Sequence, residues 1–582
     1  MIEKTDGPHF LSREHLFGAG GVFVIALAVR LLFLISSPDR SWPHSIYYEG
    51  DAPEWVSYAT ALELHQPYEF GLPLRSPAVA HVLRVLAPHL AEHMKADGHY
   101  SFVWIKALWC VCSALSCALA YLAFASALPR RVALLAAGMC DFSFASYVTA
   151  TSLNNETLYT LALMAIALST VSLARRPCIF TALGLAVMHG LATLIRPEHT
   201  LLLLLLLGYV AITWIVAPRA KEKFTLWRAS AILATVLLGS ILVCLPWSVS
   251  RSHAIQRFND TAAVPPDYDR AAVAWSAEAR AMVDSFPPFA RHDNFVYVTA
   301  VCHAKGEHQV TAKQVRQTLM DEFGALPEPL SRWIFVSSQG PLSFALANHP
   351  AAGGGFSKAA LLNPHFGGDP KLNLTMPSHL RLYNHGYAVG LGYIASDING
   401  WLKNVGLKLS HFGDGITLGF AAWNLPIGRT LVRRPVDLAT AEEGAVPIWR
   451  IAVLALIGLG MAVAVMGRMA GIWFLIILYK VIVIILFYGY ARQAAAILPA
   501  FYLFIALAFD QIGRWGSTRF KPSRRMKLLA VGTVLGGLLC IEIAAATFKM
   551  PLAIDGPIRT TPQWGQDAFE SYQTIRIKPI AK

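Results

Sequence analysis

The stretch "YYEGDAPEWVSYATALELHQPYEFGLPLRSPAV" places acidic, basic and aromatic residues directly after an apolar segment. Asp51 and Glu54 stand near its beginning, and Arg75 stands near its end. A carboxylate can take a proton from an attacking group, and a guanidinium can pair with phosphate through two parallel hydrogen bonds. The stretch therefore carries residue types suited to acid–base chemistry beside a phosphate.

Two motifs and a lone arginine place similar residues at the ends of apolar segments. The motifs are "NNE" (Asn154, Asn155 and Glu156) and "RPE" (Arg196, Pro197 and Glu198), and Arg492 lies in "YGYARQAAAILP". Lys and Arg are rare in the short loops on the outer side of a membrane. Arginines at the predicted outer ends of membrane helices therefore indicate a function other than anchoring the helix. We predict that Arg75, Arg196 and Arg492 bind a phosphate. Glu54, Asn155 and Glu198 are secondary candidates.

Asp51 has a second interpretation. In "GDAPEW" an aspartate is followed three residues later by Glu54, with Pro53 in the first turn, which is typical of a helix N-terminus. Asp51 as a cap and Asp51 as a functional carboxylate both stay open at this point. Glu54 is interpreted mainly as the capping partner.

The composition indicates what must position these residues. The chain has 582 residues with 55% hydrophobic and 15% charged, where about 25% charged is usual for a soluble domain. Apolar windows of about 18 residues or more predict an all-α polytopic membrane protein. We expect eleven spans, near 17–36, 100–124, 131–150, 155–173, 178–195, 198–217, 226–249, 448–467, 470–488, 491–510 and 526–547.

The distribution of charge predicts the orientation. Lys and Arg gather in the short loops of one side, as in "RWGSTRFKPSRRMK", which predicts a cytoplasmic N-terminus. The net charge of +13 then reflects topology and contact with the lipid bilayer. It does not indicate a nucleic-acid partner. Of the eight cysteines only Cys302 falls in the large outer region, so no disulfide framework is expected.

Three parts are expected along the chain. Residues 1–250 form a membrane core with a first outer loop at 37–98, and 447–582 contribute further spans and an outer tail. Residues 251–446 form an outer region of unassigned fold, with a capped helix in "TAKQVRQTLMDEFG" and irregular loops from about Gly340. In the first outer loop, apolar residues at helical spacing predict two short interfacial helices, at 54–64 and 78–90.

"HLAEH" at residues 89–93 matches the inverted zinc-protease pattern. Its two histidines would need a shared helix face to hold zinc. Pro88 immediately precedes the motif and no third ligand is evident, so the favoured interpretation is a solvated helix end. We predict no metal site.

The order of these features resembles the GT-C class of membrane glycosyltransferases, which includes protein O-mannosyltransferases and lipid A aminoarabinose transferases. "GDAPEWVSYA" is similar to that family's "D-E-x-x-Y-x-x-x-A" start, and "LRSPAV" is similar to its "K-P-P-L" segment, with Arg75 in the lysine's place. "LIRPEHTLLL", "LPWSVSR" and "ARQAAAILPAFYLFIALA" match further segments. The resemblance covers about 1–250 and 447–510 but not the 251–446 region.

The resemblance implies transfer of a sugar from a polyprenyl-phosphate carrier to a glycan, lipid or protein acceptor at the outer face of a bacterial inner membrane, with 251–446 periplasmic. Asp51 matches the family's catalytic acidic residue, and Glu156 is the second catalytic candidate. No cofactor is required, and a divalent cation is compatible with the chemistry.

A transporter or flippase of lipid-linked sugars is the alternative, because its arginines would bind the same headgroup without chemistry. Many transporters contain two related halves. The chain shows no internal repeat, which favours the enzyme. A membrane metalloprotease using "HLAEH" is the second alternative.

Overall fold

The computed structural model describes residues 12–516, apart from 38, 46–47, 49, 69–71, 73, 97–99, 217–225, 262–263, 363–371, 422–446 and 467–470. The span predicted at 526–547 and the predicted outer tail lie outside the described residues. The described part of the chain is mainly helical, with one parallel pair of two-residue strands, β1 (Ala274–Trp275) and β2 (Gln309–Val310).

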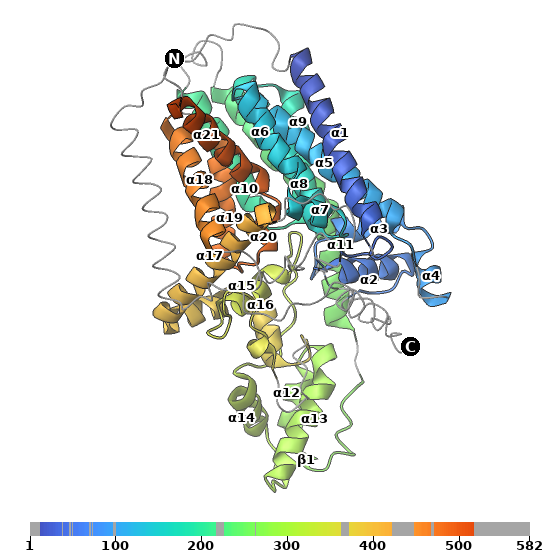
Figure 1. Ribbon diagram of the computed structural model, residues 1–582. Coiled ribbons are helices and arrows are strands. Elements are labelled where there is room, and N and C mark those ends of the chain that lie inside the picture. Colours follow the sequence, from blue (N-terminus) through green and yellow to red (C-terminus); the bar gives the residue numbers. More distant parts are fainter. Residues whose placement is uncertain are drawn as a thin grey trace.

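Apolar helices form the bundle that fills the upper part of Figure 1. They are α1 (Arg13–Ser36), α5 (Val103–Ala125), α6 (Arg130–Asp141), α7 (Phe144–Ala150), α8 (Asn155–Arg175), α9 (Ile179–Ile195), α10 (His199–Val216), α11 (Leu226–Asp260), α18 (Pro447–Met466), α19 (Gly471–Leu486) and α21 (Leu498–Gly516). In the described residues, four helices are long and apolar enough to cross a membrane, or five if the bent pair α6–α7 is one span. Four shorter helices are also apolar. The chain is thus an integral membrane protein, and the count of eleven spans stays a prediction.

The span predicted at 131–150 is broken. Helices α6 and α7 meet at 54° around Asp141, and a break frees carbonyl groups that have no water partner inside a bilayer. The fully buried Arg30 of α1 supplies donors there. Its guanidinium donates to the carbonyl oxygens of Cys140 at 3.2 Å and Asp141 at 3.3 Å, and to Ser113 Oγ at 2.7 Å. The basic residue inside the first apolar helix is therefore a structural partner of the break.

The two short helices predicted in the first outer loop are confirmed. They are α2 (Ala52–Glu63) and α3 (Ala78–Leu86), and they pack on each other through a small core that includes Trp55, Ala59, Val79 and Leu83. Helix α3 ends earlier than predicted, and a separate helix α4 (Leu90–Ala96) follows. Figure 1 shows α2, α3 and α4 together at one end of the bundle.

The predicted outer region begins without a break, because α11 continues through Pro246 and past residue 250 to Asp260. Beyond it, α12 (Ala277–Asp284), α13 (Pro288–Ala304) and α14 (Ala312–Phe323) surround their own core, which includes Trp275, Phe295 and Leu319. The capped helix is confirmed: Thr311 and Gln314 form the capping box, and Gly324 ends α14 with φ 61°.

The irregular loops predicted from about Gly340 are confirmed at 349–357, which contains "HPAAGGGF". "NPHFGGDPKLN" lies mostly outside the described residues. For the rest of the segment the prediction is wrong, because it contains α15 (Gln339–Asn348), a 3-10 turn (Lys358–Leu361), α16 (Pro377–Ser396) and α17 (Ile398–Ala421). Helix α17 reaches into the bundle, where Phe412 and Ile416 join the main core. A Cβ at Gly415 would overlap the carbonyl of Ala491, so the glycine allows close backbone packing here instead of a loop.

The predicted orientation has a direct test. Ala127 lies in the exposed turn between α5 and α6, and Ser331 lies exposed in the outer region. In a cysteine-free background, a cysteine at Ser331 is expected to react with a membrane-impermeant maleimide in intact cells. A cysteine at Ala127 is expected to react only after the membrane is opened. Labelling of Ala127→Cys in intact cells would contradict the predicted orientation in the membrane.

Candidate functional site

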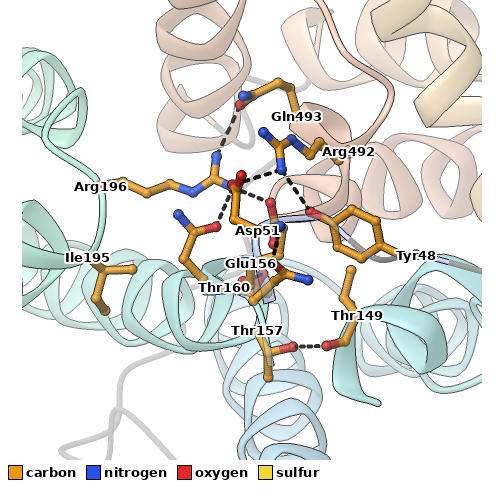
Figure 2. Close-up of polar contacts among 12 residues, drawn as sticks. Tyr48, Asp51, Thr149, Glu156, Thr157, Thr160, Ile195, Arg196, Arg492 and Gln493 are labelled. Atoms are coloured by element: carbon orange, nitrogen blue, oxygen red, sulfur yellow. Dashed lines mark hydrogen bonds and ion pairs between the residues drawn. The ribbon is translucent and has the colours of Figure 1, made fainter. Parts of the chain in front are cut away.

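The residues selected from the sequence converge at the end of the bundle beside α2. Asp51 directly precedes α2, Glu156 lies in the first turn of α8, Arg196 follows α9, and Arg492 opens the short helix α20 (Arg492–Ala495). Figure 2 shows Asp51 and Glu156 between Arg196 and Arg492. Four chain segments that are far apart in sequence therefore form one charged cluster.

Asp51 is held between two arginines. Its Oδ2 lies 2.9 Å from Nη1 of Arg492, and its Oδ1 lies 3.5 Å from Nη1 of Arg75. Its side chain makes no hydrogen bond to the α2 backbone. The capping interpretation of Asp51 is therefore wrong, because the carboxylate points across to the guanidinium groups and not along its own helix.

The backbone beside Asp51 is fixed separately. Its amide donates to Oδ1 of Asn154 at 2.8 Å, and the amide group of Asn154 donates to Ser152 Oγ at 2.7 Å. Ser152 Oγ donates in turn to the carbonyl of Tyr48 at 2.9 Å. This chain of bonds ties the start of α2 to the segment before α8, and it does not use the Asp51 carboxylate.

Glu54 is not a capping partner either. Its Oε2 accepts a hydrogen bond from the Tyr68 hydroxyl at 2.7 Å and lies 3.7 Å from Nη2 of Arg75. The side chain is 51% exposed, against 30% for Asp51. Glu54 therefore belongs to the solvent-facing edge of the cluster.

Aromatic rings support the two arginines that face Asp51. The Arg75 guanidinium lies 5.7 Å from the ring centre of Trp55, and that of Arg492 lies 5.7 Å from the ring centre of Tyr490. Arg492 also donates to the Tyr48 hydroxyl at 3.4 Å. Such contacts restrict the guanidinium groups without neutralising them.

The pKa of Asp51 reflects this surrounding. Burial by itself would raise the pKa, but the positive charges of Arg492 and Arg75, with their hydrogen bonds, bring it below the ordinary aspartate value. Asp51 is therefore a carboxylate at neutral pH. While both arginines hold it, it is a weak proton acceptor.

Arg196 forms the buried layer of the cluster. Its Nη2 donates to Glu156 Oε1 at 2.6 Å and to Asn155 Oδ1 at 3.0 Å, and its Nη1 donates to Gln493 Oε1 at 3.0 Å. Arg196 and Glu156 are only 5% and 2% exposed. The guanidinium thus joins the start of α8 to α20, and Gln493 is a site residue that the sequence analysis missed.

Lys480 is a second residue that the sequence analysis missed. It is fully buried in α19, with Nζ 3.7 Å from Glu198 Oε1, which also lies 3.5 Å from Nη1 of Arg196. A lysine inside an apolar segment is a signal in its own right, because charge in a membrane helix is costly without a partner. That signal was present in "GIWFLIILYKVIVIIL".

The charges within the described cluster balance. The carboxylates are Asp51, Glu54, Glu156 and Glu198, and the cations are Arg75, Arg196, Arg492 and Lys480. Each cation lies within 4 Å of at least one carboxylate oxygen. The three arginines predicted to hold phosphate are brought together, but all of them are paired with acids.

The shared helix face that "HLAEH" would need is not formed. His89 has φ 62° and lies in the break between α3 and α4, where it pairs with Glu92 at 3.3 Å in an exposed position. Among the described residues, no group of three or more His, Cys, Asp and Glu side chains is placed to hold a metal ion.

No protein-family model matches the chain, and no curated protein matches its sequence. Among solved structures, it is similar to the oligosaccharyltransferase AglB from Archaeoglobus fulgidus, in complex with an inhibitory peptide and a dolichol-phosphate, at 13% identity and a TM-score of 0.36. It is also similar to the apo form of an oligosaccharyltransferase from Archaeoglobus fulgidus, at 12% identity and a TM-score of 0.34. The alignments cover 97% and 95% of this chain but 60% and 59% of those chains, so the chain spans about three fifths of their length. At these values the similarity identifies neither a family nor an activity.

Proposed function

We propose that the protein is a GT-C-type glycosyltransferase that moves a sugar from a polyprenyl-phosphate carrier to an acceptor at the outer face of the membrane. One observation carries the proposal: a partly exposed carboxylate, Asp51, lies between two guanidinium groups at the end of an apolar bundle. In the predicted topology this end of the bundle lies at the membrane surface, which is where a lipid-linked donor holds its phosphate while its hydrocarbon tails stay in the bilayer.

Each step of the transfer has a group to perform it. The acceptor hydroxyl or amide attacks the sugar C1 and loses its proton to Asp51, and the bond from C1 to the phosphate oxygen breaks with its electron pair going to the phosphate. Arg75 and Arg492 stabilise the negative charge that develops on the leaving phosphate. Attack opposite the leaving group inverts the configuration at C1.

We assign Arg196 and Glu156 to positioning. Both side chains are buried, and their contacts with each other and with Gln493 hold α8 against α20, the helix that begins with Arg492. Direct contact of Arg196 with a phosphate would require this pair to open. Glu156 then acts through Arg196 and not as a proton acceptor.

The remaining parts of the proposal follow from the predicted topology. The site faces the periplasm of a bacterial inner membrane, with the N-terminus cytoplasmic and 251–446 on the same side as the site. The acceptor is a glycan, a lipid or a protein segment. The proposed chemistry requires no cofactor, and a divalent cation is compatible with it.

The purified protein is expected to transfer sugar from a defined polyprenyl-phosphate sugar, read out by intact mass of the acceptor. Arg492→Gln and Arg75→Gln should weaken binding of the carrier lipid about 10-fold each, because each removes a charge-assisted hydrogen bond to phosphate from a partly exposed site. Arg84→Gln is the matched control, since Arg84 lies exposed on α3 outside the cluster. Unchanged lipid binding in both site variants would remove the phosphate role.

A further inference from the structure

The two arginines assigned to the donor phosphate are already occupied by an anion. Each oxygen of Asp51 faces one of them, with Oδ2 on Arg492 and Oδ1 on Arg75. A phosphate that binds both guanidinium groups needs the same two positions. Carboxylate and phosphate are therefore rivals for one pair of cations.

We propose that Asp51 is the resident anion of the phosphate site, and that the donor phosphate displaces it from Arg75 and Arg492. The displaced carboxylate is then released to accept the proton of the acceptor. This inference rests on the proposed function, and it adds that the proton acceptor becomes available only when the donor is bound.

The described cluster offers no spare cation that would let both anions stay. Arg196 is buried against Glu156 at 2.6 Å, and Lys480 is buried with Glu198 as its nearest carboxylate. A phosphate added beside an unmoved Asp51 would place like charges next to each other without a further positive charge. Exchange of partners avoids that repulsion.

Asp51 is built to exchange partners. Its backbone is held by the bond from its amide to Asn154 Oδ1 at 2.8 Å, while its carboxylate makes no bond to its own helix. Rotation of the side chain therefore breaks only the contacts to the two arginines and leaves α2 in place. The side chain is 30% exposed, so it has an open side toward solvent.

Displacement also changes the chemistry of the carboxylate. The positive charges of Arg492 and Arg75 hold the pKa of Asp51 below its ordinary value. Once phosphate takes these charges, the carboxylate becomes a better proton acceptor. Asp51 thus becomes an effective proton acceptor only after the donor phosphate has bound to the two arginines. The charges by themselves set this order of donor binding before proton transfer.

Competition between Asp51 and phosphate predicts that removing the Asp51 carboxylate strengthens phosphate binding. Phosphate binding without displacement of Asp51 does not require this. Asp51→Asn removes the rival anion, so it should bind a polyprenyl phosphate that carries no sugar about 10-fold more tightly than the wild type, although it cannot complete the transfer. Asp51→Ser also removes the carboxylate, with a smaller side chain. It should therefore show the same tightening even if the asparagine side chain of Asp51→Asn fits poorly between the guanidinium groups. The corresponding polyprenol, which has no phosphate, should bind all variants alike.

Two controls separate direct competition from a general charge effect. Glu54→Gln makes the same change in net charge three residues away, in the first turn of α2. Glu54 pairs with Arg75 at 3.7 Å and not with Arg492, and its side chain is 51% exposed, so its removal should tighten binding much less. Asp51→Glu keeps the negative charge and should show no tightening. Thermal unfolding of each purified variant checks that the fold is retained.

The outcomes are distinct. Tighter phosphate binding in the neutral Asp51 variants, together with weaker binding in Arg492→Gln, supports displacement. Equal or weaker binding in the neutral Asp51 variants, with Arg492→Gln still weakened, overturns displacement but leaves the phosphate site in place. If neither arginine variant changes binding, the phosphate is held elsewhere, and the proposed site and this inference both fall.

Discussion

Asp51→Asn is expected to lower the rate of sugar transfer by about 10²–10⁴-fold, which is the usual contribution of a general base. Asn occupies nearly the same volume but cannot take the acceptor's proton. Since the Asp51 side chain makes no capping bond in the structure, no loss of α2 is expected to accompany the loss of rate. Single-turnover transfer with pre-bound donor measures the effect on the chemical step itself.

Glu54→Gln is the matched control, because it neutralises a carboxylate three residues away, in the first turn of α2. Its expected effect on the rate is much smaller, because Glu54 accepts a hydrogen bond from the Tyr68 hydroxyl and lies near Nη2 of Arg75. Wild-type transfer by Asp51→Asn would overturn the mechanism. A transporter, which breaks no bond, would show no transfer in any variant and would leave only the binding effects.

Arg196→Met is expected to destabilise the protein by about 3–5 kcal/mol, the cost of removing one partner from a buried ion pair. The change leaves Glu156, only 2% exposed, without the guanidinium that lies 2.6 Å from its Oε1. It also removes the hydrogen bond to Gln493 that joins α20 to the start of α8. Denaturation in mixed detergent micelles, followed by circular dichroism, measures the loss.

The double variant Arg196→Met with Glu156→Gln is expected to recover much of that stability, because the uncompensated buried charge is then gone. Arg492→Met provides the comparison, since Arg492 and its partner Asp51 are both more exposed and the pair is screened by solvent. If Arg196→Met were no more destabilised than Arg492→Met, the positioning role of Arg196 would be wrong. That result would favour the earlier prediction that Arg196 binds the phosphate directly.

The case of Asp51 shows where local pattern and tertiary contact separate. "GDAPEW" correctly predicts that a helix begins at Ala52, because the Asp, Pro and Glu preferences of a first turn act within a few residues. The same pattern also predicts a capping role, and that role is wrong. Whether the carboxylate turns to its own helix depends on Arg75 and Arg492, which arrive from elsewhere in the chain.

Helix α17 shows a second limit of local pattern. The loop prediction came from the Gly-, Pro- and Asn-rich stretches before it and was extended over α17, yet Gly415 and Gly489 are the points where α17 and the segment before α20 pack backbone to backbone. A glycine needed for close approach and a glycine needed for a turn look alike in one sequence. The partner surface alone distinguishes them.

By itself the sequence determined the helical membrane architecture, the two short helices of the first outer loop, the capped α14 and seven of the eight charged residues that meet in the cluster, all but Lys480. These features depend on apolar length, helical periodicity and capping, which all act over short stretches of chain. Only the tertiary structure decided which acid pairs with which base, that Arg196 is buried while Asp51 stays partly exposed, and that Gln493 and Lys480 join them. Charge pairing is decided by distance in space, and residues such as Asp51 and Arg492 come within 2.9 Å only when the whole bundle has assembled.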